Sequence, residues 1–135
     1  MNRRLPAFFC IGVSVACSKP SETSDTTATE ITRTVLERIP IEGTNDELRL
    51  MLMEFPPGAS SARHQHPAAG VCYVIQGVAE SQYEGESPRR FNAGESYRDS
   101  AKRAHLIFRN PSATQTLRFT CVAKIGKDES FFQPL

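Results

Sequence analysis

The sequence predicts an all-β fold, and three observations support this prediction. Beyond Ile31, turn-forming residues recur about every ten residues, the runs between them are rich in β-branched and aromatic residues, and no window shows a helical period. Regularly spaced short strands without helices are typical of a sandwich or a barrel. With 135 residues, the chain has room for one domain, which we expect to span residues 31–135.

Residues 1–16 have the pattern of a secretion signal. Met1 to Arg4 form a short positive segment, and residues 5–16 are uncharged and too few to span a membrane. Ser14-Val15-Ala16-Cys17 resembles the lipobox of bacterial lipoproteins, although the first lipobox position usually holds Leu. This resemblance implies that Cys17 is lipidated. Cleavage by the ordinary signal peptidase is the alternative, and it would leave Cys17 as an unmodified terminal residue.

Residues 17–30 are predicted to form a disordered tether. Ser, Thr, Pro and acidic residues dominate this stretch, which cannot bury enough apolar surface to fold. A leash between lipid and domain and a merely disordered terminus both fit the composition. If Cys17 is lipidated, the protein is expected in the cell envelope, facing the periplasm and bound to the membrane by its lipid alone. If not, it is secreted. By the enterobacterial sorting pattern, Ser18 favours the outer membrane.

The charge of the chain excludes a strongly basic nucleic-acid-binding protein. Sixteen Lys and Arg balance fifteen Asp and Glu, which gives a net charge of +1. Removal of residues 1–16, which hold Arg3 and Arg4 and no acid, leaves about −1. The sequence contains no basic run, so no nucleic-acid partner is expected.

Eight strands are expected in the body of the chain, with turns such as Pro56-Pro57-Gly58 and Asn110-Pro111-Ser112 between them. The expected ranges are Ile31–Ile39, Glu47–Phe55, Val71–Gln76, Val78–Tyr83, Arg89–Asn92, Glu95–Arg98, His105–Arg109 and Thr116–Ile125. The last strand has the clearest pattern, because apolar and polar residues alternate from Leu117 to Ile125.

The chain contains three histidines, and they are the main candidates for a metal site. His64 and His66 are two residues apart, so both point to one face of an extended strand. Imidazole nitrogen is a ligand for Zn, Cu, Fe and Ni, and His105 would supply a third. An isolated pair of this kind is a weak signal, so its surroundings decide the interpretation.

Those surroundings resemble the two sequence motifs of the cupin superfamily. Gly58, five residues, His64-Gln65-His66 and a closing Gly77 follow the first motif. Gly94, His105 and Asn110 follow the second, so the resemblance covers residues 58–112. It implies a double-stranded β-helix, or jelly-roll barrel, with a divalent metal inside. The resemblance places His64, His66 and His105 at ligand positions, and the expected metal is Fe, Mn, Zn or Ni.

One family ligand is missing. Most metal-binding cupins carry a Glu four residues after the second histidine, and this chain has Gly70 there. A three-histidine site, an acid from another strand, and a barrel that binds no metal are the interpretations left open. Asp99, six residues before His105, is the candidate acid, either as a metal ligand or as the partner of a bound water. An exposed Asp that opens a turn is the alternative.

Other residues have two interpretations each. Cys72 and Cys121 are expected to be small buried hydrophobes, with a disulfide as the alternative in an oxidising compartment. The stripe from Met51 to Phe55 is core or the wall of a ligand pocket. Arg98, Lys102 and Arg103 are solvated loop cations, or else attract a carboxylate substrate.

Two main functions follow from the resemblance, since cupins include dioxygenases, isomerases and decarboxylases. One is a small-molecule metalloenzyme at the cell envelope. The other is a non-catalytic module that binds a ligand or a metal, which the missing Glu favours. A structural scaffold is a weaker third. Many cupins are dimers, so a homodimer is an expected assembly, although no feature of the sequence fixes it.

Overall fold

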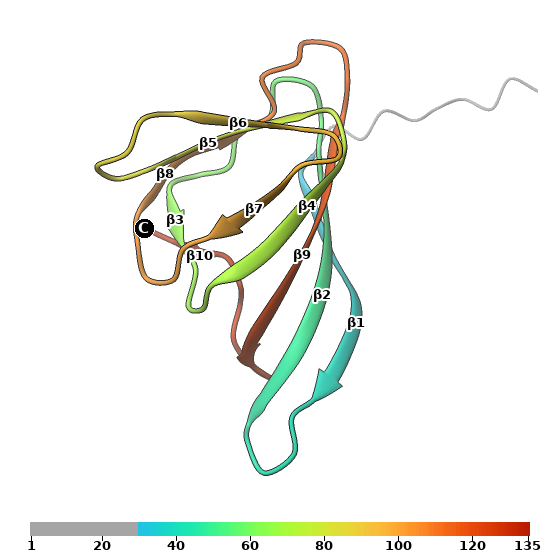
Figure 1. Cartoon of the computed structure of the whole chain (residues 1–135), viewed down its shortest axis with the longest axis vertical. Helices are drawn as coiled ribbons and strands as arrows, with labels where there is room; N and C mark the ends of the chain where they lie inside the picture. The colour runs from blue at the N-terminus through green and yellow to red at the C-terminus, as the bar shows by residue number, and fades with distance from the viewer. Residues whose placement is uncertain (1–29) are drawn as a thin grey trace, which may run out of the picture.

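Two five-stranded antiparallel sheets pack face to face (Figure 1). The computed structural model describes residues 30–135. One sheet has the order β1-β2-β9-β4-β7 and the other β10-β3-β8-β5-β6. The strands are β1 (Thr32–Pro40), β2 (Asp46–Phe55), β3 (His64–Gln65), β4 (Gly70–Gln76), β5 (Val78–Tyr83), β6 (Arg89–Asn92), β7 (Ser96–Asp99), β8 (His105–Arg109), β9 (Leu117–Gly126) and β10 (Gln133–Pro134). The all-β prediction is confirmed.

All eight predicted strands are present, and their ends differ from the predicted ends by at most one residue. The sequence did not predict β3 and β10, which have two residues each and pair with one another. The signal segment, Cys17 and nearly all of the predicted tether lie outside the described residues. In residues 30–135, no helix is long and apolar enough to cross a membrane.

The core lies between the two sheets, and the inward-facing side chains of β2, β4 and β9 form most of it, with others such as Phe91 and Phe108 from the opposite sheet. Every second residue of β9 from Leu117 to Ile125 is buried, as the sequence predicted. Phe55 on β2 and Val74 on β4 complete the centre of this core. Each large apolar side chain that leaves water contributes about 2 kcal/mol to folding. Tyr73, on the opposite face of β4, is half exposed.

Cys72 and Cys121 form a disulfide, so the expectation of two unpaired buried thiols is wrong. Both residues are buried as predicted, and they lie directly opposite one another on β4 and β9. Their Cα atoms are 4.1 Å apart. The register between two strands far apart in the sequence brings the two sulfurs together, and no local pattern shows that register.

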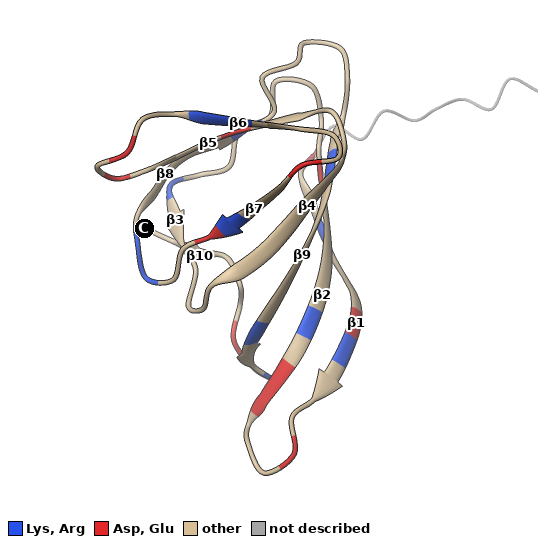
Figure 2. Cartoon of the chain, in the orientation of Figure 1, with Lys and Arg blue, Asp and Glu red and all other residues tan. Residues whose placement is uncertain are grey.

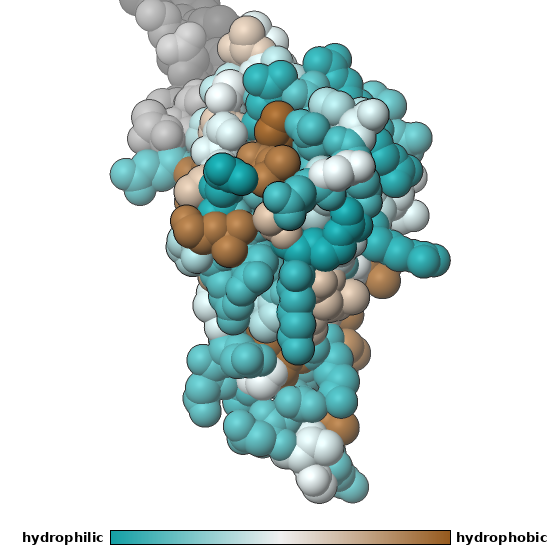
Figure 3. All heavy atoms as spheres, turned by 90° about the vertical axis from the view of Figure 1, so that its left-hand side faces the viewer, coloured by the Kyte–Doolittle hydropathy of each residue, from teal (hydrophilic) through white to brown (hydrophobic). Residues whose placement is uncertain are grey.

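Acidic and basic residues are interspersed along the strands and loops (Figure 2). Most ion pairs have at least one exposed partner, such as that of Arg103 with Glu86. The face shown in Figure 3 is mostly hydrophilic, and its apolar residues form separate small groups. Glu47 and Arg49 form a buried pair on the inner face of β2.

Candidate metal site

Three segments bring the histidines together inside the barrel. His64 on β3 is directly opposite His105 on β8. His66 follows β3, and its carbonyl accepts a 2.8 Å hydrogen bond from the backbone N–H of Lys102, in the turn before β8. The ligand atoms of the three histidines lie within 4.8 Å of one another, and all three side chains are buried. The three histidines therefore form a group that is able to hold a metal ion.

Hydrogen bonds orient two of the rings for this purpose. The Nδ1 of His64 lies 2.8 Å from the Ala62 carbonyl, and the Nδ1 of His66 lies 2.8 Å from the Phe131 carbonyl. A carbonyl only accepts hydrogen bonds, so each Nδ1 carries the proton and each Nε2 keeps its lone pair. Metal-bound histidines are held in this way by outer partners.

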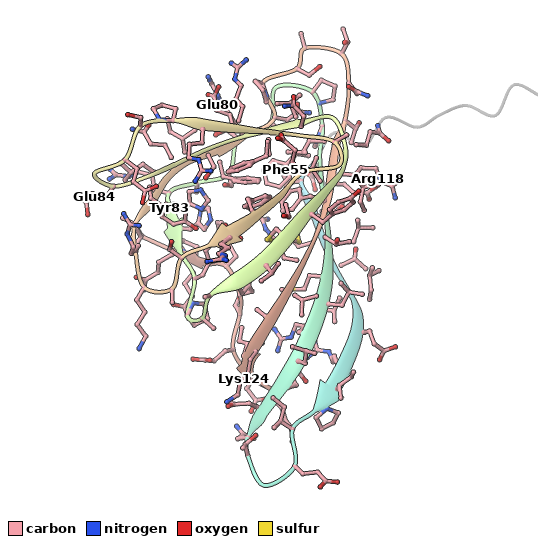
Figure 4. All side chains as sticks on the ribbon, in the orientation of Figure 1. Phe55, Glu80, Tyr83, Glu84, Arg118 and Lys124 are labelled. Atoms are coloured by element: carbon pink, nitrogen blue, oxygen red, sulfur yellow. A yellow bond between two sulfur atoms is a disulfide. The ribbon has the colours of Figure 1, made fainter. Side chains whose placement is uncertain are left out.

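His105 is oriented by a hydroxyl group. Its Nε2 lies 2.8 Å from the Ser81 Oγ, and its ring stacks at 4.0 Å between centroids on Tyr83, which is labelled in Figure 4. Among the described residues, the Nδ1 of His105 and the Nε2 of His66 are buried without a hydrogen-bond partner. Buried nitrogens without a partner are costly unless a ligand takes them, so the donor set fits a metal ion.

Burial keeps the histidines neutral, the state in which imidazole binds metals. Burial lowers the pKa of His64 to about 4, with smaller downward contributions from the nearby His66 and Arg33. Burial likewise lowers the pKa of His105 to about 3. The pKa of His66 is also lowered by burial, against the hydrogen bond to Phe131. At neutral pH all three rings are uncharged, so a metal would not compete with protons.

The ring of Phe131 fills the space next to Gly70, where most cupins carry the carboxylate ligand. A Cβ atom at Gly70 would lie 2.8 Å from the Cζ of Phe131, closer than carbon atoms approach one another. Phe131 also stacks on His66, with 4.3 Å between centroids. The C-terminal segment thus supplies both a carbonyl and a ring to the site, and it leaves no space for a side chain at Gly70.

Gly70→Ala should therefore lower the free energy of unfolding by about 2 kcal/mol, because the added methyl group overpacks the ring of Phe131. Urea denaturation of the single variant, of Phe131→Ala and of the double variant forms a cycle that measures this coupling. We expect Gly70→Ala to lower the free energy of unfolding much less when Phe131 is also replaced by Ala. Equal costs in both backgrounds would show that Phe131 does not occupy this space.

A buried acid lies across from Gly70 on the neighbouring strand. Asp99 on β7 pairs directly with Gly70 on β4. Asp99 is buried, so its interpretation as an exposed turn residue is wrong. Its Oδ2 lies 3.6 Å from the Nε2 of His66, and its Oδ1 accepts a 3.0 Å hydrogen bond from the Tyr83 hydroxyl. Burial raises the pKa of Asp99 to about 7, although the bond from Tyr83 lowers it.

A cavity of about 190 Å³ opens beside the histidines. Its wall includes Met51, Met53 and Phe55 of β2, which also belong to the core, so both interpretations of this stripe hold. Arg33 and Phe132 line the same cavity. Three cations near the second motif were the candidate carboxylate-binding group, but they do not line this cavity. Arg98, Lys102 and Arg103 are exposed and lie outside it.

Comparison with known families agrees with the fold. A family model described as a cupin domain matches residues 51–123, which is more than half of the chain. The chain belongs to the cupin family. No curated protein matches this cupin.

Solved structures with the same fold come from several bacteria. A Klebsiella pneumoniae protein described as uncharacterized, with a double-stranded β-helix domain, has a TM-score of 0.60 and 22% identity and covers 79% of this chain and 87% of its own. The polyketide cyclase RemF of Streptomyces resistomycificus has a TM-score of 0.60 and 22% identity, covering 81% of this chain and 73% of its own. The DMSP lyase DddQ of Ruegeria pomeroyi has a TM-score of 0.59 and 21% identity, and this chain spans 49% of its length. At these identities the likeness shows the fold.

Several residues of the site were not predicted from the sequence. Ser81, Tyr83 and Phe131 contact the histidines from β5 and from the C-terminal segment, and Arg33 lines the cavity from β1. Gly70 was the one feature of the sequence that could have indicated a ring at this place. Interiors are close-packed, so another group must fill the space that the usual carboxylate leaves.

Proposed function

We propose that this cupin binds a divalent metal through His64, His66 and His105 and acts on a small molecule at that metal, as a lipid-anchored protein of the cell envelope. The main support is the convergence of three buried, neutral imidazoles beside a cavity. Three protein ligands leave positions open for water or a substrate. Iron, manganese, zinc and nickel all suit such ligands.

Asp99 is the proposed source of the missing acid. Its Oδ2 lies close to the metal-facing nitrogen of His66, and Tyr83 holds the other oxygen in place. A carboxylate in this position either joins the metal shell or orients a water bound there. The pairing of Asp99 with Gly70 moves the acid by one strand relative to the usual cupin position.

When bound, the metal would supply Lewis acidity to an oxygen of the ligand. The chain itself orients the three imidazoles, excludes water with Phe131 and Phe132, and provides an apolar wall from β2. The buried disulfide supports the envelope location, because disulfides persist in exported proteins. Among the neighbours of the same fold, one is named a cyclase and one a lyase, which fits an enzyme acting on a small organic molecule.

Elemental analysis of the protein, purified without a histidine tag, tests the metal site. We expect about one equivalent of metal in the wild type, and almost none in the His64→Ala/His66→Ala variant, because one imidazole cannot hold the ion alone. Gln65→Ala is the matched control, since Gln65 lies between the two histidines and outside the donor group. It should keep the metal.

Asp99→Asn adds a second comparison, with an expected loss of about tenfold or more in metal affinity if the carboxylate supports the shell. A wild type that takes up no iron, manganese, zinc or nickel on reconstitution would rule out the proposed function.

A non-catalytic binding module is the second candidate, and the position of Phe131 favours it. The ring takes the place of a carboxylate that most metal-binding cupins use. Turnover of a small molecule by the metal-loaded wild type would decide for the enzyme. Tight binding without turnover would decide for the module.

A further inference from the structure

The cavity wall includes Arg33, an arginine exposed to solvent whose charge is not used by the fold. Arg33 lies on the edge strand β1, directly opposite Met53 of β2, so it projects from the inner face of the sheet. Within residues 30–135, Arg33 forms no salt bridge with any acid. The other arginine of the cavity wall, Arg49, is fully engaged with Glu47 and backbone carbonyls.

Aromatic contacts hold Arg33 near the histidines. Its Cζ lies 4.3 Å from the ring centroid of Phe132, and that centroid lies 4.5 Å from the ring of His64. The two distances together place the guanidinium carbon within about 9 Å of the His64 ring. An arginine that lies over an aromatic ring is oriented by it, and its N–H donors, which lie in the plane of the guanidinium group, stay free to bind a ligand.

The rest of the cavity has no competing charge at this end. Asp99 is the one acid among the residues that line it, and it is buried at the inner end beside His66 and Tyr83. Apart from the three histidines, Arg49 and two serines, the rest of the wall is largely apolar, with Met51, Met53 and other core side chains. A volume of about 190 Å³ is below the range typical of drug-sized ligands.

We propose that the ligand of this site is a small organic carboxylate, whose carboxylate group is bound by Arg33 at the mouth of the cavity while its apolar body lies against β2. A planar carboxylate matches the paired donors of a guanidinium group. This proposal rests on the proposed function, which places the other end of the ligand at the metal. It adds the charge and the size of the ligand and names Arg33 as a residue that determines specificity. It also replaces the second-motif cations, which lie outside the cavity, as the carboxylate-binding group.

Benzoate and benzamide are suitable probes, because they share shape and apolar body and differ in charge. Their affinities would be measured by calorimetry on the metal-free and on the zinc-loaded protein. We expect the wild type to bind benzoate at least about tenfold more tightly than benzamide, because a hydrogen bond between charged groups strengthens binding by about that factor. In the metal-free protein, where no zinc can bind the carboxylate, this preference should fall to about one in Arg33→Gln and be partly kept in Arg33→Lys, which retains the charge without the planar fork.

Arg98→Gln is the matched control, because Arg98 is an exposed arginine outside this cavity and should leave the preference unchanged. Equal binding of both probes by the wild type would overturn the proposal. So would a preference that, in the metal-free protein, survives Arg33→Gln or disappears in Arg98→Gln.

The metal-free arm separates the two proposals. If the protein takes up no metal and its benzoate preference still depends on Arg33, the proposed metal function fails and the carboxylate site is supported. A protein that holds metal and shows no preference would keep the metal function and remove the carboxylate site.

Discussion

Replacement of both disulfide cysteines, as Cys72→Ala/Cys121→Ala, should lower the free energy of unfolding by about 4 kcal/mol. The bond joins residues separated by 49 positions, so it removes much of the conformational freedom of the unfolded chain. It also links β4 to β9 in the middle of the sheet that carries Gly70 and Asp99. Small single domains depend heavily on such bonds because their cores are limited.

Urea denaturation of the variant and of the oxidised wild type measures this difference. The variant should also have a larger unfolded-state surface and hence a steeper dependence on urea. The matched control is the wild type in a thiol reductant: the bond is buried, so the folded protein should keep it until the chain unfolds. Identical denaturation midpoints for the variant and the wild type, together with alkylation of Cys72 and Cys121 themselves in the unreduced protein, would show that the bond does not form.

The eight long strands could be predicted because their signal is local. Alternation of apolar and polar residues, as from Leu117 to Ile125, depends only on which face of a strand is buried. The strands β3 and β10 have no such signal. They have two residues each, and they exist because β3 pairs with β8 on one side and with β10 on the other. Sequence propensity does not determine pairing at this scale.

The histidines could be predicted from the cupin motif, whereas their partners could not. Asp99 was a candidate on its position in the sequence, but only strand register shows that it faces Gly70. Arg33 and Phe131 reach the site from the two ends of the domain, and Phe131 contacts His66 across 65 positions of the sequence. Contacts of this kind depend on how the sheets curve and pack, which no short pattern encodes.

Arg49 connects the core to the segment that covers the metal site. Its guanidinium donates to the carbonyl of Glu129 at 2.8 Å and to those of Gly126 and Lys127 at 3.2 Å. Its Nε donates to Glu47 at 2.6 Å. These bonds fix the turn after β9, and that turn leads directly to Phe131. The position of the ring beside His66 therefore depends on an arginine on another strand.

Arg49→Met should lower the free energy of unfolding by about 3 kcal/mol, because three carbonyls and Glu47 lose a buried charged donor and methionine replaces only the apolar part of the side chain. Urea denaturation measures this loss, and hydrogen exchange of the amides in residues 127–135 should show faster opening of the C-terminal segment. Arg38→Met is the matched control: Arg38 also bonds Glu47, but it is 47% exposed and does not contact the segment. It should cost less than about 1 kcal/mol and leave exchange in residues 127–135 unchanged. If both variants lost the same stability and the segment stayed protected, Arg49 would act only as the partner of Glu47, and Phe131 would be held in place by its stacking on His66.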